Sequence, residues 1–323
     1  MFLSVIIPAY NEEKRLQETL KKLRDYFKNQ KYTYEVYVVN DGSRDGTAEV
    51  VGELMVDLNK ARRDIPERSG GVPNAVRDRA GVGHRKRAGC PEGFNSPGNF
   101  RLIDNKENRG KGAVVKQGML EAKGDWRLFM DADNSTDIEE IEKLWDYAKN
   151  GLGASFASSH PNQPTQPLPN QLAPGSLKSE RGLDRHFAQD APSAPEKYDV
   201  IIGSRYLKAD SIKIKQPLIR RMVSRFGNWL SGVLLGLDMV DTQCGFKLFS
   251  AKAAEDIFPK QTIMRWGFDM EILAIAKHRG YQIKEVAVDW YDSTGSTVRK
   301  SAALKTLKEL IIIKWNLMRG KYR

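Results

Sequence analysis

The chain has little cysteine and no long hydrophobic run, and both shortages exclude classes of protein. Its two cysteines, Cys90 and Cys244, are too few and too far apart to form a disulfide framework or a zinc site, which favours a reducing, cytoplasmic setting. No stretch reaches the roughly 18 consecutive apolar residues of a membrane span, and the nearest run covers only residues 229–237. The first residues lack the basic and apolar regions of an export signal. We therefore expect a cytoplasmic protein whose membrane contacts are peripheral.

Positive charge is what the chain has in excess. The formal net charge is +11, and apolar residues make up 40% of the 323 residues, enough for a folded core. A basic protein favours anionic partners, which are nucleic acid, phosphorylated small molecules or an acidic membrane. Charge alone does not separate these three classes.

Two segments interrupt the hydrophobic pattern. Residues 59–99 are rich in Gly, Arg and Pro, residues 150–196 are rich in Pro, Ser and Gln, and neither shows a period of 2 or 3.6. Both follow a predicted helix and precede a predicted strand, so we expect flexible insertions at the edge of a sheet where strands begin. Ligands of open α/β sheets bind at the opposite edge. The insertions are therefore predicted to lie away from the chemistry.

Outside the insertions, short β-branched runs alternate with helical patterns. Helices are expected over residues 12–27, with Asn11 as the N-terminal cap, and from the capping-box sequence at 136–139 to residue 149. The predicted strands are residues 3–7, 35–39, 101–103, 126–130, 199–202 and 283–288. This alternation predicts an α/β fold with a parallel sheet.

Polar clusters follow four of the predicted strands directly. They are residues 8–11 (PAYN), 40–43 (NDGS), 131–133 (DAD) and 203–205 (GSR). Any one of them could be an ordinary turn or a helix cap. Four clusters at one edge of one sheet indicate a ligand site, because such sheets bind ligands where their strands end.

The third cluster has the composition of a metal site. Asp131 and Asp133 flank one small residue, so both carboxylates can approach one hard cation while water and phosphate oxygens fill its other positions. Mg²⁺ or Mn²⁺ fits these ligands, and the metal would neutralise charge on a leaving diphosphate. We therefore predict that Asp131 and Asp133 hold a divalent cation.

A glycine-rich loop at residues 108–112 (NRGKG) precedes a predicted helix. Its backbone amides and two cations gather at the positive end of that helix, an arrangement that binds anions. The spacing matches neither a P-loop nor a dinucleotide fingerprint. The alternative is a solvated basic loop without a ligand.

Two basic segments have apolar residues at helical spacing. Residues 213–230 and 302–323 each place a row of large apolar side chains among Lys and Arg. Such helices can lie in the interface of an anionic membrane. The alternative is that both pack on the domain and keep their charges in water.

Seven stretches together resemble family 2 glycosyltransferases of the GT-A type, most closely the dolichyl-phosphate β-glucosyltransferases, with dolichol-phosphate mannose synthases as a related branch. They are residues 5–13 (VIIPAYNEE), 39–43 (VNDGS), 108–112 (NRGKG), 131–133 (DAD), 202–206 (IGSRY), 241–249 (DTQCGFKLF) and 266–271 (WGFDME). They occur in the family's order and span nearly the whole chain outside the insertions. The resemblance implies a Rossmann-like, mostly parallel sheet with a catalytic core over residues 1–249. Residues 250–323 would be the C-terminal part of the same domain, with the acceptor side and the membrane-surface helices.

The resemblance also implies roles for individual residues. Asp41 would accept a hydrogen bond from the uracil ring, and Arg205 would bind the acceptor phosphate with its fork of donors. Asp269 is the candidate general base. The other positions implied for the donor are Pro8, Tyr10, Glu12, Lys111 and the metal-binding Asp131, and those implied beside the reacting groups are Lys247 and Gln243.

The implied reaction is inverting transfer of glucose from UDP-glucose to a polyprenyl phosphate at the inner face of a membrane. The second pKa of a phosphate monoester is near ~6, so the acceptor is largely ionised at neutral pH, and positioning should matter more than a base. The alternatives are mannose transfer from GDP-mannose and a family 2 transferase acting on a polysaccharide or glycan. A sugar-nucleotide pyrophosphorylase would need a glycine-rich opening loop. A nucleic-acid-binding module would need a recognisable nucleic-acid-binding motif. The sequence has neither, and no nucleic-acid partner is expected.

Overall fold

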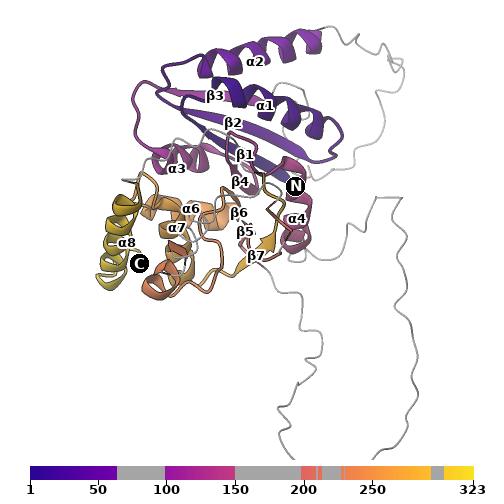
Figure 1. Cartoon of the computed structure of the whole chain (residues 1–323). Coiled ribbons are helices and arrows are strands. Elements are labelled where there is room, and N and C mark those ends of the chain that lie inside the picture. Colours follow the sequence, from indigo (N-terminus) through magenta and orange to yellow (C-terminus); the bar gives the residue numbers. More distant parts are fainter. Residues whose placement is uncertain (64–98, 150–197, 209, 213–226, 229, 292–301) are drawn as a thin grey trace, which may run out of the picture.

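A sheet of seven strands among the described residues forms the centre of the protein (Figure 1). The computed structural model describes residues 1–63, 99–149, 198–208, 210–212, 227–228, 230–291 and 302–323. The strands are β1 (Phe2–Ala9), β2 (Thr33–Asp41), β3 (Phe100–Asn105), β4 (Trp126–Met130), β5 (Val200–Ser204), β6 (Phe246–Ser250) and β7 (Ile283–Ala287). Their order across the sheet is β3-β2-β1-β4-β6-β5-β7. Strands β1, β2, β4 and β5 are buried along nearly their whole length, which is why they are continuous apolar runs in the sequence.

All strand pairs are parallel except those of β6, which runs antiparallel to both β4 and β5. The six strands expected from the sequence are present, and the mostly parallel sheet is confirmed. Sequence reasoning missed β6, because Lys247 interrupts a short apolar run. The reversed direction of β6 brings the residues before Phe246 to the edge where the other strands end. These residues therefore join the predicted ligand edge.

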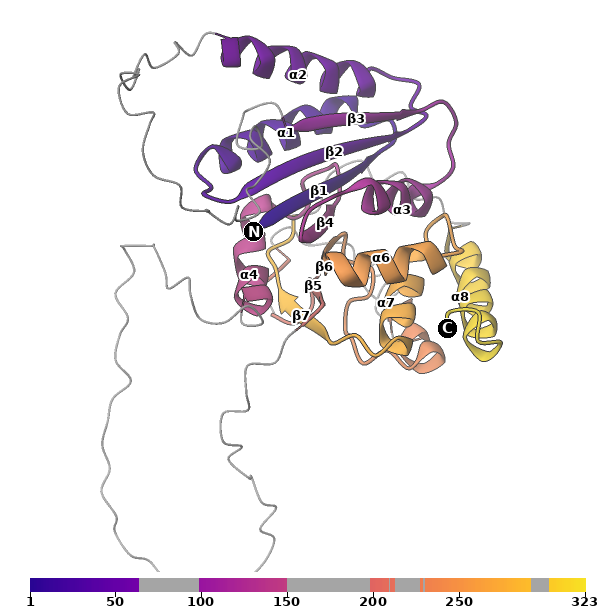
Figure 2. The same cartoon turned by 180° about the vertical axis from the view of Figure 1, so that it is seen from behind.

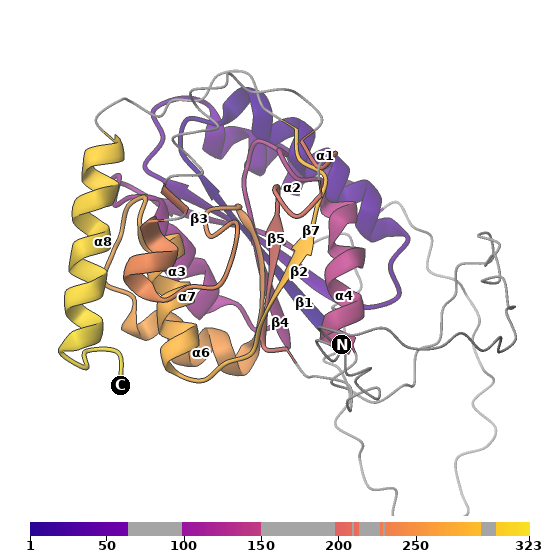
Figure 3. The same cartoon turned by 60° about the horizontal axis from the view of Figure 1, so that its bottom comes forward.

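Helices cover both faces of the sheet. They are α1 (Glu13–Lys28), α2 (Thr47–Arg63), α3 (Lys111–Glu121), α4 (Ile141–Lys149), α6 (Ala251–Lys260), α7 (Phe268–His278) and α8 (Ala302–Met318), with a 3₁₀ turn at Ile138–Glu140 before α4. Helices α1, α2 and α4 pack on one face, and α3, α6 and α7 pack on the other (Figure 2). Helix α8 lies outermost, against α7 (Figure 3). Among the described residues, no helix is both long enough and apolar enough to cross a bilayer.

Each face of the sheet has its own buried cluster of side chains. On the face covered by α7, the rings of Phe129 in β4 and Phe268 in α7 have centroids 5.8 Å apart. This contact fixes the first turn of α7, which carries Asp269, beside the end of β4. The core packing therefore positions one of the predicted catalytic residues.

Two expectations about helix caps were wrong. Asn11 does not cap α1, because its φ is +55° and its side-chain oxygen accepts a hydrogen bond from the amide of Arg44 at 2.9 Å. In the predicted capping box, Asp137 rather than Thr136 is the cap, and it caps the 3₁₀ turn before α4, where its carboxylate accepts from the amide of Glu139. Asn11 instead joins the loops after β1 and β2.

The structure describes the two predicted insertions only at their borders. Helix α2 extends to Arg63, so its last turn lies inside the first segment, and the chain re-enters the described part just before β3. The second segment connects α4 to β5. Both therefore lead into the beginning of a strand, as expected. Residues 64–98, 150–197 and the predicted amphipathic stretch 213–226 lie outside the described residues.

Candidate active site

The ends of β2 and β3 and the loops after β1 and β2 form one polar rim at the predicted ligand edge. The Ser43 hydroxyl accepts from the amide of Asn11 at 2.9 Å and donates to the Asn40 side chain at 2.5 Å. Asn40 donates to Asp104, near the end of β3, at 2.7 Å. These bonds fix three strand ends relative to one another before any ligand binds.

Lys111 and Asp131 meet beside this rim. Lys111 Nζ lies 2.6 Å from Asp131 Oδ1, which joins the first residue of α3 to the residue after β4. Burial alone would lower the pKa of Lys111, but the charges of Asp131 and Asp269 outweigh burial and raise it. The pair puts a fixed positive charge beside a predicted metal ligand.

Gly245 determines where Asp131 can lie. It directly precedes β6, and its carbonyl oxygen accepts a hydrogen bond from the amide of Asp131 at 3.1 Å. A Cβ atom at this position would lie 2.1 Å from Asp131 Oδ2, so any side chain would displace the carboxylate. The loop at residues 241–245 therefore carries a steric requirement that the sequence did not reveal.

Asp133 belongs to a neighbouring group of charges. Its carboxylate accepts from the amide and the hydroxyl of Ser135 at 3.0 and 2.6 Å, and Arg15 Nη1 lies 3.8 Å away. Arg15 also pairs with Glu12 at 2.7 Å. Burial raises the pKa of Glu12, Arg15 counteracts burial, and the charges of Asp133 and Asp131 add to the increase. Three carboxylates thus influence one another here.

The two aspartates have the donor set of a divalent-cation site. Desolvation raises the pKa of Asp131, Lys111 lowers it, and the charge of Asp133 raises it again. A hard cation would relieve this repulsion between carboxylates. Within the described part of the chain, no group of three or more acidic, His or Cys side chains could hold a metal ion. The binding of a metal ion by Asp131 and Asp133 therefore stays a prediction.

Asp41 holds the glycine-rich loop in place. Its buried carboxylate accepts from the amides of Arg109 and Gly110 at 2.7 and 2.9 Å. Burial raises the pKa of Asp41, and the two amides counteract that shift. Gly110 has φ +98°, and a Cβ there would lie 2.4 Å from the carbonyl oxygen of Met264. The contact of Asp41 with uracil stays a prediction, since both oxygens already accept bonds from the loop.

Lys247 and Asp269 form a buried ion pair. Lys247 Nζ lies 2.5 Å from Asp269 Oδ1 and 2.5 Å from the carbonyl oxygen of Cys244. Asp269 lies in the first turn of α7, where the helix dipole favours a negative charge. The pair ties β6 to α7 across the site. These contacts favour positioning as the role of Asp269.

Arg205 is fixed by a bidentate pair with Asp241. Its Nε and Nη2 donate to the two carboxylate oxygens at 2.7 and 2.8 Å, and its amide donates at 3.0 Å. The Asp241 amide donates to Glu285 of β7 at 2.8 Å. Burial opposes both charges, but the pairing prevails, so the pKa of Asp241 is lowered and that of Arg205 is raised. The rings of Tyr206 and Trp290 also flank the guanidinium, with centroids 5.3 and 5.5 Å from its carbon.

Three predicted residues lie at the edge without joining these pairs. Pro8 is buried within β1, Tyr10 follows β1 with its side chain 44% exposed, and Gln243 is half-buried in the 241–245 loop. Their predicted contacts with the nucleotide and the sugar stay predictions.

Sequence reasoning missed the partners of the predicted residues. Arg15 lies three residues after Glu12, a spacing that places two side chains on one helix face and is a usable signal. Asp241 lies in a motif that carries the family resemblance, but its partner Arg205 is 36 residues away. No spacing rule predicts such a contact.

Comparison with protein families decides the class of this site. The family model described as Glycosyl transferase family 2 matches residues 4–76 and 87–182, more than half of the chain. The chain belongs to glycosyl transferase family 2. It is therefore a glycosyltransferase, and the family resemblance of the sequence motifs is confirmed.

Relatives with names and a solved structure agree with this assignment. Dolichyl-phosphate beta-glucosyltransferase ALG5A of Trichomonas vaginalis is 30% identical over 97% of this chain and 73% of the relative. The dolichyl-phosphate beta-glucosyltransferase of Homo sapiens is 29% identical over 99% of this chain and 77% of the relative. Glucosyl-3-phosphoglycerate synthase of Mycobacterium tuberculosis, solved with Mn²⁺, UDP and phosphoglyceric acid, is 11% identical, with a TM-score of 0.53 over 99% of this chain and 78% of that chain. This likeness shows the GT-A fold.

Proposed function

We propose that this family 2 glycosyltransferase transfers glucose from UDP-glucose to a dolichyl-type polyprenyl phosphate, with inversion at the anomeric carbon. The observation that carries the proposal is that relatives named dolichyl-phosphate beta-glucosyltransferase match nearly the whole chain. An α-linked donor gives a β-linked product when a single in-line displacement occurs. The charge pairs at one sheet edge support this reaction, because donor and acceptor are both phosphorylated.

The donor would lie across the loops that follow β1, β2 and β4. Pro8, Tyr10 and Glu12 would line the nucleotide, with Asp41 near the uracil edge. The exposed ring of Tyr10 is suited to stack on a base. Lys111 and the first turn of α3 would face the diphosphate, because the N-terminal end of a helix stabilises negative charge. The amides of Arg109 and Gly110 already donate to Asp41 and would hold the loop in place.

Asp131 and Asp133 would hold Mg²⁺ or Mn²⁺, which when bound neutralises charge on the diphosphate leaving group. Lys111 holds Asp131, while Ser135 and Arg15 hold Asp133. Both carboxylates are therefore oriented before the ligand arrives. Such preorganisation avoids reorganisation at the moment of reaction.

Arg205 would hold the acceptor phosphate, and the Lys247–Asp269 pair would position its attacking oxygen, with Gln243 beside the sugar. A phosphate monoester is largely dianionic at neutral pH, so a base has little to remove. One phosphate oxygen forms the bond to the anomeric carbon while the bond to the UDP oxygen breaks, and UDP leaves with that electron pair. The fixed positions of the reacting groups and the fixed charges around them then accelerate the transfer.

Helix α8 would hold the enzyme at the cytoplasmic face of a membrane. Leu310 and Ile313 are buried on one side of the helix. The opposite side exposes the apolar row of α8: Leu307, Ile311, Trp315 and Met318. Lys308, Lys314 and Arg319 flank this row at helical spacing. An apolar row between cations suits an interface with anionic lipids, which are concentrated in the cytoplasmic leaflet.

The test is transfer of radiolabelled sugar from UDP-glucose or GDP-mannose to a short polyprenyl phosphate, with and without Mn²⁺. We expect metal-dependent glucosyl lipid, lost in Asp133→Ala and kept in Asp146→Ala, which removes an exposed carboxylate from α4. Formation of a mannosyl lipid instead would show that the donor is GDP-mannose. If no lipid product forms although the protein still binds UDP, the acceptor would be a polysaccharide or glycan rather than a polyprenyl phosphate.

A further inference from the structure

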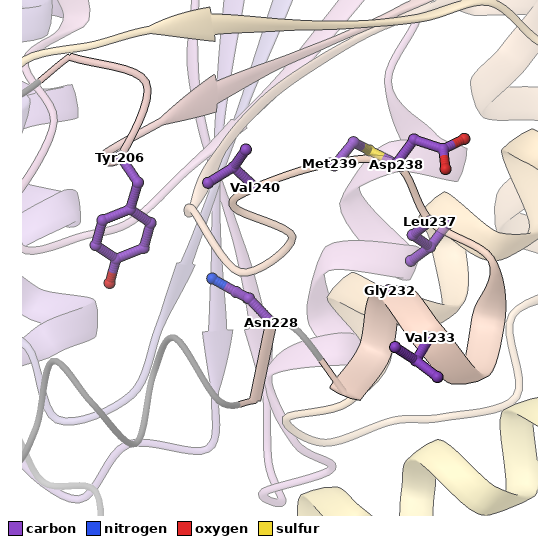
Figure 4. A pocket seen from close by; sticks show the side chains of 8 residues that line it. All are labelled: Tyr206, Asn228, Gly232, Val233, Leu237, Asp238, Met239 and Val240. Atoms are coloured by element: carbon purple, nitrogen blue, oxygen red, sulfur yellow. The ribbon is translucent and has the colours of Figure 1, made fainter.

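A pocket outside the residues assigned above lies next to Arg205. Its volume is about 440 Å³, within the roughly 300–1,000 Å³ of pockets that bind small molecules. Figure 4 shows its lining, which includes Tyr206, Asn228, Val233, Leu237, Met239 and Val240. Tyr206 directly follows Arg205 in the chain, so the pocket adjoins the predicted acceptor-phosphate contact.

Asn228 brings an unused hydrogen-bond donor to this pocket. Its side-chain oxygen accepts from the Thr242 hydroxyl at 3.1 Å, and the residue is only 5% exposed. Within the described part of the chain, its Nδ2 has no hydrogen-bond partner. Figure 4 shows this nitrogen directed into the space that Tyr206 and Val240 also line. A buried donor left without an acceptor costs about 1–3 kcal/mol, so a ligand oxygen that accepts from this nitrogen would be stabilised here.

The remainder of the lining is mostly apolar. Leu237 and Met239 form part of it, and Val233 and Val240 are 63% and 49% exposed at its rim. Asp238 also belongs to the lining, but its carboxylate is almost fully exposed and pairs with Lys277. The pocket therefore suits an amphiphile with an apolar chain and a hydrogen-bond acceptor at one end.

Val240 and the loop at residues 241–245 join this pocket to Asp131, one of the two predicted metal ligands. Val240 lines the pocket, Thr242 donates to Asn228, and Gly245 packs on Asp131. Five residue steps span at most about 18 Å at roughly 3.6 Å each. The pocket and Asp131 are thus separated by no more than a short extended segment. An acceptor whose chain lay in the pocket could present its head to the donor.

We propose that this pocket binds the first isoprenoid units of the acceptor lipid, with Asn228 Nδ2 donating to an oxygen of its phosphate. The inference rests on the proposed function for the identity of the lipid. The apolar wall takes the isoprenoid chain, while Arg205 and Asn228 approach the phosphate from two elements. The pocket thereby selects a lipid phosphate over a phosphorylated sugar, which would leave the apolar wall uncovered.

Photo-crosslinking tests the pocket without requiring turnover. The full chain in detergent would be labelled with a polyprenyl phosphate that carries a diazirine in its first isoprene unit, and labelled peptides would be mapped by mass spectrometry. We expect the label within residues 228–240, displaced by unmodified polyprenyl phosphate. Label confined to other peptides overturns the proposal. Label in this segment without any sugar transfer would support the lipid pocket but contradict the proposed reaction. The experiment therefore distinguishes failure of the pocket proposal from failure of the proposed function.

Kinetics of three variants provide the second test. Asn228→Asp keeps the acceptor for Thr242 but places a negative charge where the donor was, and Val233→Glu charges the exposed rim. Both should raise KM for the lipid phosphate at least about tenfold, because a hydrogen bond to a charged group and an apolar contact are lost. KM for UDP-glucose should stay within about twofold. Val56→Glu, at a 52% exposed position on α2, is the matched control. An unchanged KM for the lipid in both pocket variants overturns the proposal.

Discussion

Lys247 donates to the carboxylate of Asp269 at 2.5 Å, and both side chains are buried. Replacing Lys247 by Met leaves that carboxylate buried without its partner. We expect the free energy of unfolding to fall by about 3–5 kcal/mol, as is typical when one member of a buried pair is removed. Sugar transfer should fall by about 10²-fold or more, because a preorganised charge is lost from the site. Urea unfolding and initial rates measure the two effects.

A double variant separates stability from catalysis. Lys247→Met with Asp269→Leu removes both charges, so most of the lost stability should return while transfer stays low. Lys28→Met, which breaks an exposed pair with Asp25, is the control and should change neither quantity appreciably. Transfer at the wild-type rate in the double variant would show that the pair is only structural.

Gly245→Ala should inactivate the enzyme without unfolding it. The added Cβ would lie 2.1 Å from Asp131 Oδ2, so the carboxylate must move out of its position. We expect a loss of about 10²-fold in kcat with an unchanged circular-dichroism spectrum. Gly52→Ala in α2 is the matched control, because its Cβ would meet nothing within 4 Å. That substitution should stabilise the protein by about 0.5–1 kcal/mol. Normal activity in Gly245→Ala would show that Asp131 does not need this position.

The positions of Asp131 and Arg205 at one edge could be predicted because polar residues directly after parallel strands share that edge. The contacts that orient them could not. Arg205 meets Asp241 across 36 residues, and Tyr322 meets Glu271 across 51. Local sequence patterns contain no information about contacts between residues so far apart in the chain.

Strand β6 was missed for a related reason. A lysine in the middle of a strand argues against burial when only the sequence is considered, and Lys247 is buried because Asp269 neutralises it. Asn11 was taken for a helix cap because short polar residues favour that position. Its positive φ and its bond to Arg44 come from a loop packed against it, which is a tertiary effect.

Asp133→Asn should remove the dependence of UDP binding on metal. In the wild-type protein we expect Mn²⁺ to strengthen UDP binding at least about tenfold, since a cation held by Asp131 and Asp133 would attract the negatively charged diphosphate. In the variant the gain should be less than about twofold. Titration calorimetry with and without Mn²⁺ measures both, with Asp146→Asn as the control. A variant that keeps the full gain would exclude Asp133 as a ligand.

Tyr322→Phe should loosen the glycine-rich loop from a distance. The buried Tyr322 hydroxyl donates to Glu271 at 2.6 Å, and Glu271 also accepts from the amides of Thr262 and Ile263 at 2.9 and 2.7 Å. The same segment holds α3, because the Ala113 amide donates to the Met264 carbonyl at 3.2 Å. Loss of a hydrogen bond to a charged group should cost about 1.5–3 kcal/mol of stability.

The Tyr322→Phe variant should also bind UDP several-fold more weakly than the wild type. Urea unfolding and UDP titration are the measurements, and Tyr291→Phe, at an exposed position, is the control. Reduced stability with unchanged UDP affinity would limit Tyr322 to a structural role.

The apolar row of α8 should bind anionic vesicles. Ile311→Glu together with Trp315→Glu introduces two negative charges into the row and removes its largest exposed side chain. Sedimentation with vesicles containing anionic lipid should show binding by the wild type that weakens as salt rises, because the flanking cations are then screened. Binding by the double variant should be at least about tenfold weaker, since burial of one large apolar side chain contributes about 1.5–3 kcal/mol. Val56→Glu, which charges an exposed position on α2, should bind as the wild type does. Equal binding of the double variant and the wild type would place membrane attachment elsewhere in the chain.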